Sequence, residues 1–301
     1  MVEHVFARVV RTVTVSALAL ATSVGASGTA GAASPEDHPV EVSIGASGLQ
    51  APDTAKGGLV SFRVKTDDPN GRQLQLLRPH GGVTIDQVIR DLADAVSPSP
   101  ATASAGIRAV NGEADLLGGA LVTSQVHEQF TEEVSPGPVY LLDLTAFRAD
   151  PAHPVSRLLN LVGTNGQNDN QVRFDDGIVI EKDTAEGPRF QTEDVDHAHL
   201  AYLVHDGSEQ IHEMQLRPIG ADTTDEQIGE YLRDVALGGL PARSPFTGPA
   251  TGLGAMSGDR TASVQAHGLQ PGRYVLLCMI PDERTGVPNA GLGMRKIVTL
   301  K

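Results

Sequence analysis

The chain has 301 residues, of which 37 are acidic and 23 are basic, and its formal net charge is −14. A surface of that sign disfavours binding to nucleic acids and anionic membranes, because their phosphate groups are bound by Lys and Arg. Tryptophan is absent and aromatic residues are few, so a platform that stacks sugars or bases is not expected.

The first 33 residues have the order of a secretory signal peptide. Arg8 and Arg11 precede an apolar run of small residues, and Ala30-Gly31-Ala32 has the A-x-A pattern of a cleavage site. The run is shorter than the roughly 20 apolar residues that a membrane-spanning helix needs. We therefore expect residues 1–33 to be removed on export, leaving a secreted chain with no later segment apolar enough to span a membrane.

An internal repeat organises the rest of the chain. The segment Leu76–Ala95 matches Gln215–Ala236, and Ser135–Leu144 matches Gln270–Met279. Blocks that recur in the same order at nearly constant spacing indicate two copies of one structural module. The sequence therefore predicts a tandem duplication.

The two predicted domains are 34–170 and 171–301, and the polar stretch 163–170 between them resembles a linker. Each copy contains short strand-like segments, several with alternating apolar residues such as Val60 and Phe62. A Gly-, Pro-, Ser- and Ala-rich loop follows the one helix of each copy. This pattern predicts an all-β protein made of two tandem Greek-key β-sandwich domains, each with one short helix.

The start of each predicted helix carries a capping box, in which two side chains satisfy backbone donors of the first turn. Thr84 with Gln87 forms this pattern in the first copy, and Thr223 with Glu226 forms it in the second. Apolar residues then recur at helical spacing in both copies. We expect each helix to lie with this apolar stripe against a sheet.

The chain has a single cysteine, Cys278, which cannot form a disulfide within the chain. It is a buried bystander, an intermolecular partner or a functional thiolate. The repeat places Asp143 at the equivalent position of the first copy. Because a carboxylate is rarely tolerated in a dry core without a partner, this comparison favours an accessible position for Cys278.

The second copy resembles exported proteins of the cupredoxin family, the plastocyanin-type blue copper fold. The resemblance rests on the stretch DGSEQIHEMQL, on the turn and strand PGRYVLLCMI, and on the loop that ends in Gly293-Met294. It implies that His212, Cys278 and Met294 are ligands of one copper ion. Thiolate and thioether suit Cu(I) and imidazole suits Cu(II), so such a centre supports electron transfer.

The chain departs from the family pattern at Asn289, which stands where the second histidine ligand is usual. The resemblance then implies a looser copper site, in which the amide offers only a weak oxygen ligand. His205 and His267 are candidates for a substitute ligand, although nothing in the sequence places either one beside Cys278.

No ligand position is retained in the first copy. The repeat places Gln73 opposite His212, Asp143 opposite Cys278 and Leu159 near the position of Met294. We therefore expect the first domain to bind no metal.

Other chemical motifs are few. His197 and His199 form one H-x-H pair, whereas a multicopper oxidase needs several, and a surface strand entrance is the simpler interpretation. No G-x-S-x-G turn, H-E-x-x-H helix or phosphate-binding loop occurs, so an enzyme is not expected.

The leading hypothesis is a secreted tandem cupredoxin-like protein whose second domain binds one copper ion for electron transfer or copper handling. Its partner would be a redox protein or another extracellular protein, and not a nucleic acid. The alternative is a metal-free extracellular binding module that has lost the copper site. Asn289 and the ligand-free first copy favour that alternative.

Overall fold

The computed structural model describes residues 39–164, 176–199, 201–236, 238–239, 241 and 243–301. The predicted signal peptide, the predicted domain boundary at residue 170 and most of the predicted linker lie outside the described residues. No helix within the described part of the chain is both long enough and apolar enough to cross a membrane.

Residues 39–164 of the first half contribute eight strands and three helices. In chain order they are β1 (Val40–Gly45), β2 (Gly48–Gln50), β3 (Thr54–Lys65), β4 (Arg72–Pro79), α1 (Ile85–Ala95), α2 (Pro100–Glu113), β5 (Ala114–Val122), β6 (His127–Val134), β7 (Gly137–Asp143), α3 (Leu144–Ala149) and β8 (Ser156–Thr164).

The second half contributes eight strands and one helix within the described residues. They are β9 (Gly177–Thr184), β10 (Gly187–Glu193), β11 (Ala201–Asp206), β12 (His212–Pro218), α4 (Asp225–Ala236), β13 (Thr251–Met256), β14 (Thr261–His267), β15 (Gly272–Leu277) and β16 (Arg295–Leu300). Strands thus dominate both halves, which confirms the all-β class.

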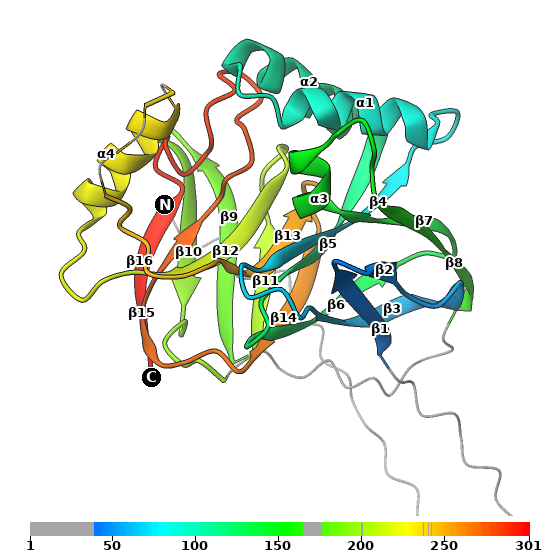
Figure 1. Ribbon diagram of the computed structural model, residues 1–301, viewed down its shortest axis with the longest axis horizontal. Coiled ribbons are helices and arrows are strands. Elements are labelled where there is room, and N and C mark those ends of the chain that lie inside the picture. The colour runs from blue at the N-terminus through cyan, green and yellow to red at the C-terminus, as the bar shows by residue number, and fades with distance from the viewer. Residues whose placement is uncertain (1–38, 165–175, 200, 237, 240, 242) are drawn as a thin grey trace, which may run out of the picture. The chain divides into compact units, whose positions relative to one another are not determined.

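The strands form two sheets, and each sheet contains strands from both halves (Figure 1). Sheet A has the order β10-β9-β11-β14-β6-β3-β1-β2, and sheet B has the order β8-β7-β4-β5-β13-β12-β15-β16. The strand β3 joins them, because its first residues pair with β8 and the rest pair with β6. The inner faces share one core of buried apolar side chains, as in a β-sandwich.

The same pairing pattern occurs in both halves. In sheet A, β1 lies parallel to β3 and β3 antiparallel to β6, as β9 lies parallel to β11 and β11 antiparallel to β14. In sheet B, the order β5-β4-β7-β8 is repeated as β13-β12-β15-β16. Equivalent strands meet across the middle, β6 with β14 and β5 with β13, both antiparallel. The two halves therefore share both sheets.

The helices differ between the halves, and here the sequence prediction is wrong in part. The predicted loop after α1 contains α2, which packs side by side with α1 (Figure 1). At their contact a side chain on Gly106 would collide with the backbone at Ala95, so a small residue is required there. The small residues that suggested a loop instead allow two helices to approach closely. A further short helix, α3, follows β7 and is capped by the Asp143 carboxylate.

The predicted N-cap of α1 is confirmed, since the Thr84 hydroxyl accepts a hydrogen bond from the Gln87 N–H at 3.3 Å. The reciprocal half of the predicted capping box is not formed, because the Gln87 side chain donates to Glu113 at 3.0 Å. In α4 the box lies one residue later than predicted. The Thr224 hydroxyl accepts from the Gln227 N–H at 3.3 Å, and the Gln227 side chain accepts from the Thr224 N–H at 3.0 Å. Two consecutive threonines made this register ambiguous in the sequence.

Candidate functional site

Three of the predicted site residues meet in the second half of the chain. His212 begins β12, Cys278 directly follows β15, and Asn289 lies in the loop between β15 and β16. The Cys278 Sγ lies 3.5 Å from the His212 Nδ1, and the Asn289 Nδ2 lies 3.3 Å from the same nitrogen and 3.8 Å from the sulfur. None of the three side chains is exposed to solvent.

The loop 279–294 folds back on Cys278 through backbone hydrogen bonds. The Ala290 N–H donates to the Cys278 carbonyl at 2.7 Å, and the Asn289 N–H donates to the Ile280 carbonyl at 3.0 Å. These bonds hold Asn289 opposite the cysteine. The backbone bonds of the loop therefore bring together Cys278 and Asn289, which are 11 positions apart in the sequence.

Met294 reaches the same place through its backbone and through packing. Its carbonyl accepts from the Cys278 N–H at 3.2 Å, and its own N–H donates to the Asn289 carbonyl at 2.9 Å. Its side chain is fully buried in the same apolar cluster as Cys278. The polar side-chain contacts, however, join His212, Cys278 and Asn289.

Burial controls the protonation of the two strong donors. It lowers the pKa of His212 to about 4, although the Asp183 and Asp282 carboxylates act in the opposite direction. Burial also raises the pKa of the Cys278 thiol well above its usual value, and the Glu213 and Glu181 carboxylates add to this effect. The resting pair is therefore a neutral imidazole beside a neutral thiol. A metal ion binding there must displace the thiol proton.

The Asn289 amide is oriented by its own contacts. Its nitrogen donates to the Ile280 carbonyl at 3.1 Å and faces the His212 Nδ1, while its oxygen has no hydrogen-bond partner among the described residues. An amide nitrogen has no lone pair to offer a metal. In this orientation Asn289 directs its N–H donors, and not its oxygen, toward His212 and Cys278.

Two acidic side chains lie buried near the cysteine, and the sequence analysis did not single them out. Glu181 of β9 and Asp206 of β11 are register partners, and neither is exposed. Both oxygens of Glu181 and one of Asp206 lack a hydrogen-bond partner within the described residues. Burial raises the pKa of Asp206 to about 7 and that of Glu181 well above its usual value. Both carboxyls are thus stabilised in the protonated form.

The helix α2 of the first half covers the loop that follows Cys278. Ser104 and Arg108 donate to the Glu283 carbonyl at 2.6 and 2.8 Å, and the Asn111 amide donates to the Glu283 carboxylate at 2.7 Å. The expectation that Cys278 is accessible is therefore wrong. Its carboxylate counterpart, Asp143, is tolerated in a buried position because it caps α3 and pairs with Arg72 at 3.2 Å.

The other histidines lie elsewhere. His205 pairs with the Thr261 hydroxyl at 2.9 Å, and His267 is exposed at the register position opposite His127. His197 contacts Asp196 at 2.6 Å near the C-terminus. Neither His205 nor His267 is placed as a substitute for the second imidazole.

Copper fits this donor set in part. Within the described residues, no three His, Cys, Asp or Glu side chains are grouped so as to hold a metal ion. Two such donors, His212 and Cys278, are adjacent. Metal–sulfur and metal–nitrogen bonds of about 2.3 and 2.0 Å at a tetrahedral angle imply a sulfur–nitrogen separation of about 3.5 Å, which is the separation found.

The equivalent positions of the first half serve other purposes. Gln73 donates to the Glu213 carboxylate at 2.9 Å, and Asp143 caps α3. Leu159 is fully buried in the apolar core. Gln73 and Glu213 were not predicted as site residues, because their contact joins positions 140 residues apart and leaves no local signal.

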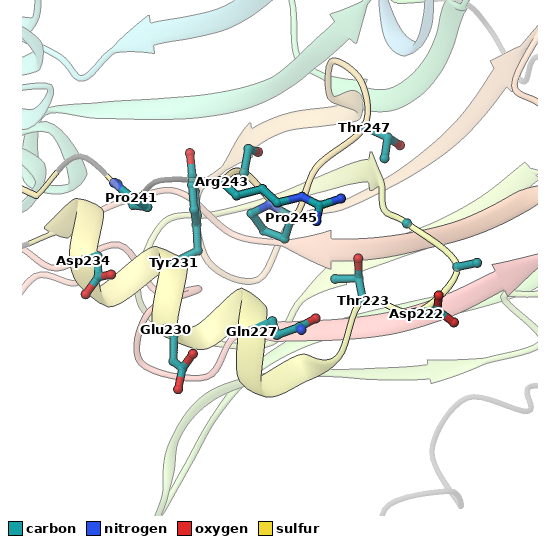
Figure 2. Close-up of a pocket in the computed structure, with 13 residues that line it drawn as sticks. Asp222, Thr223, Gln227, Glu230, Tyr231, Asp234, Pro241, Arg243, Pro245 and Thr247 are labelled. Carbon is teal, nitrogen blue, oxygen red and sulfur yellow. The ribbon is translucent and has the colours of Figure 1, made fainter.

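A separate surface pocket of about 610 Å³ lies between α4 and the loop before β13 (Figure 2). Figure 2 shows Tyr231 and Gln227 of the helix on one side and Arg243 and Pro245 of the loop on the other. Its lining residues include none of the cluster around Cys278. The two features are therefore distinct.

Comparisons with known proteins concern the fold. No protein-family model matches the chain, and a search of curated proteins finds no significant match. The solved structure of auracyanin B is 17% identical over 41% of this chain and 86% of its own, with a TM-score of 0.25. Rusticyanin from Thiobacillus ferrooxidans is 13% identical over 41% and 76%, with a TM-score of 0.22.

The multicopper oxidase mgLAC is 10% identical and covers 87% of this chain and 84% of its own, with a TM-score of 0.22. The expectation that the chain is not an enzyme stays a prediction. The chain has an all-β fold, and its site chemistry rests on the residues described above.

Proposed function

We propose that the second half of this chain binds one copper ion through His212, Cys278 and Met294. Its role would be electron transfer or copper handling outside the cytoplasm. The observation that carries the proposal is the 3.5 Å separation of the Cys278 Sγ and His212 Nδ1 in a fully buried position. Bound there, copper would supply a one-electron couple whose reduced state favours sulfur and whose oxidised state favours imidazole.

The protein's own residues determine how such an ion would be held. The lowered pKa of His212 keeps its imidazole unprotonated at neutral pH, so its lone pair is available. Met294 is buried in the same apolar cluster and carries a soft thioether. Asn289 stands where a second histidine would supply a further strong nitrogen ligand. Two soft sulfur donors and one imidazole favour Cu(I) over Cu(II).

The proposal also includes that the chain arose by tandem duplication and that it is exported. The repeated strand pairing and the recurring sequence blocks support an origin from two copies of one cupredoxin-like module. The residue order of 1–33 supports secretion, and a redox or extracellular protein is the partner class that such a location favours.

A metal-free binding module is the second candidate function. It is favoured by the Asn289 amide nitrogen, which faces the His212 Nδ1, the Cys278 Sγ and the Ile280 carbonyl and so offers these groups hydrogen bonds without a metal. In that case the cluster is a structural element of the second half. The function would then lie on the surface.

Copper loading separates the two candidates. Purified protein is titrated with Cu(I) in competition with a chromophoric chelator, then oxidised and scanned for thiolate-to-copper absorption. Binding of one equivalent that is lost in Cys278→Ser supports the copper centre. No competition at micromolar copper, with a thiol that still titrates after unfolding, would support the metal-free module.

A further inference from the structure

Glu213 links the two chain segments that form the candidate copper site. Its Oε1 accepts from the Met279 N–H at 3.1 Å and from the Gln215 amide at 2.7 Å, and its Oε2 accepts from the Gln73 amide at 2.9 Å. Met279 directly follows Cys278, and Glu213 directly follows His212. The carboxylate therefore fixes the spacing between the two ligand-bearing segments.

The first half of the chain holds Glu213 in place. Gln73 is 3% exposed, and its Oε1 accepts from the Arg148 Nη1 at 2.8 Å while its Nε2 donates to Glu213. Both ends of the Gln73 amide are thus engaged, so its orientation is determined. The contacts form one chain from Arg148 of α3 through Gln73 of β4 to Glu213 of β12.

Three N–H donors from three segments of the chain engage the Glu213 carboxylate. They are the Gln73 amide of β4, the Gln215 amide of β12 and the Met279 backbone N–H. Both oxygens of Glu213 accept hydrogen bonds, so the position of the carboxylate is determined.

We propose that Gln73 and Arg148 of the first half are positioning residues for the Cys278 site of the second half. They hold the Glu213 carboxylate against the Met279 N–H, and Met279 directly follows Cys278. The positioning stands on contacts within the metal-free protein. That the positioned site binds copper rests on the proposed function, so the two are tested separately.

Amide hydrogen exchange of the metal-free protein tests the positioning. In Gln73→Leu, the Met279 amide is expected to exchange at least tenfold faster relative to the amides of Val275 and Leu276 in the preceding strand β15. Arg148→Met is expected to act in the same direction. Equal protection of Met279 in the wild type and in both variants would overturn the proposal.

Gln75→Leu is the matched control. Gln75 lies on the same strand, is 1% exposed and also bridges the halves, through two hydrogen bonds with Ala255. It makes no contact with Glu213, so Met279 protection should fall no more than that of its neighbours. A selective loss at Met279 in this control would also overturn the proposal, because any interface defect would then have the same effect.

The double variant Gln73→Glu with Glu213→Gln tests the hydrogen-bond chain while keeping polar side chains at both buried positions. It keeps one carboxylate and one amide in the chain but moves the carboxylate next to Arg148. Met279 protection should stay within twofold of the wild type. Failure to retain it, in a protein with wild-type circular dichroism, would contradict the proposed hydrogen-bond chain.

Copper loading separates this proposal from the proposed function. If the wild type binds no copper, the proposed function fails, while the exchange experiment still decides whether Gln73 and Arg148 position Glu213.

Discussion

The Asn289 amide presents its nitrogen to the His212 imidazole at 3.3 Å, and its oxygen is left without a hydrogen-bond partner among the described residues. The position expected to hold a second metal ligand is therefore occupied by a hydrogen-bond donor.

Asn289→His should convert the site. An imidazole would supply the missing strong nitrogen ligand beside His212 and Cys278. We expect Cu(II) affinity at least tenfold above the wild type, with an intense thiolate-to-copper absorption band. Competition with a chelator and visible spectroscopy measure both effects. Asn289→Ala is the control, and an equal gain in that variant would mean that removing the amide, not adding an imidazole, opens the site.

Glu128 should make stability depend on pH. It is fully buried, and among the described residues its carboxylate accepts one hydrogen bond, from the Gly252 N–H at 3.0 Å. Burial raises its pKa to about 8. Because the folded pKa lies above the unfolded one, its contribution is fully present below about pH 4.5 and is lost as pH rises through 8. The slope is at most about 1.4 kcal/mol per pH unit.

Glu128→Gln should remove this dependence, so the variant becomes more stable than the wild type at pH 9 but not at pH 5. Urea unfolding at pH 5, 7 and 9 measures the difference. Glu133→Gln is the control, because Glu133 lies on the same strand with its side chain exposed. A change in that control like the one in Glu128→Gln would assign the effect to net charge instead of burial.

Gly286 should not tolerate a side chain. It has a φ of +69° and lies against α2, where an added Cβ would collide with the Pro100 carbonyl oxygen. We expect Gly286→Ala to lower the free energy of unfolding by at least about 1 kcal/mol. Gly112→Ala, on α2 itself, meets open space and should raise stability by up to about 1 kcal/mol. Equal effects in thermal unfolding would argue against the covering role of α2.

The cap of α4 can be tested by paired substitutions. Thr224→Ala removes the hydroxyl that accepts from Gln227 and should cost about 1 kcal/mol. Thr223→Ala leaves that bond in place and should cost less. Chemical denaturation of both variants gives the comparison, and a larger loss in Thr223→Ala would support the register that the sequence suggested.

Local patterns were sufficient for much of the fold and for part of the site. Alternating apolar residues predicted the strands, the capping box at Thr84 predicted α1, and the recurring blocks predicted that one pairing scheme would be used twice. The family resemblance singled out His212 and Cys278, which the structure brings to 3.5 Å. Short-range side-chain periodicity and turn chemistry carry the information about strands and helix starts, and neither depends on distant contacts. The site residues came from the resemblance.

Tertiary packing decided the rest. The small residues of α2 predicted a loop from the sequence, but in the structure they allow α1 and α2 to approach closely at Gly106. The helix α2 also covers the loop that follows Cys278. The orientation of the Asn289 amide depends on the Ile280 carbonyl, and the role of Gln73 depends on Glu213, which lies 140 residues away. The amino-acid sequence alone thus identified the donors, but only the folded chain determined that they are enclosed, which amide atom faces them and which residues hold them in place. Hydrogen-bond direction and burial are properties of contacts between distant segments, so no local pattern encodes them.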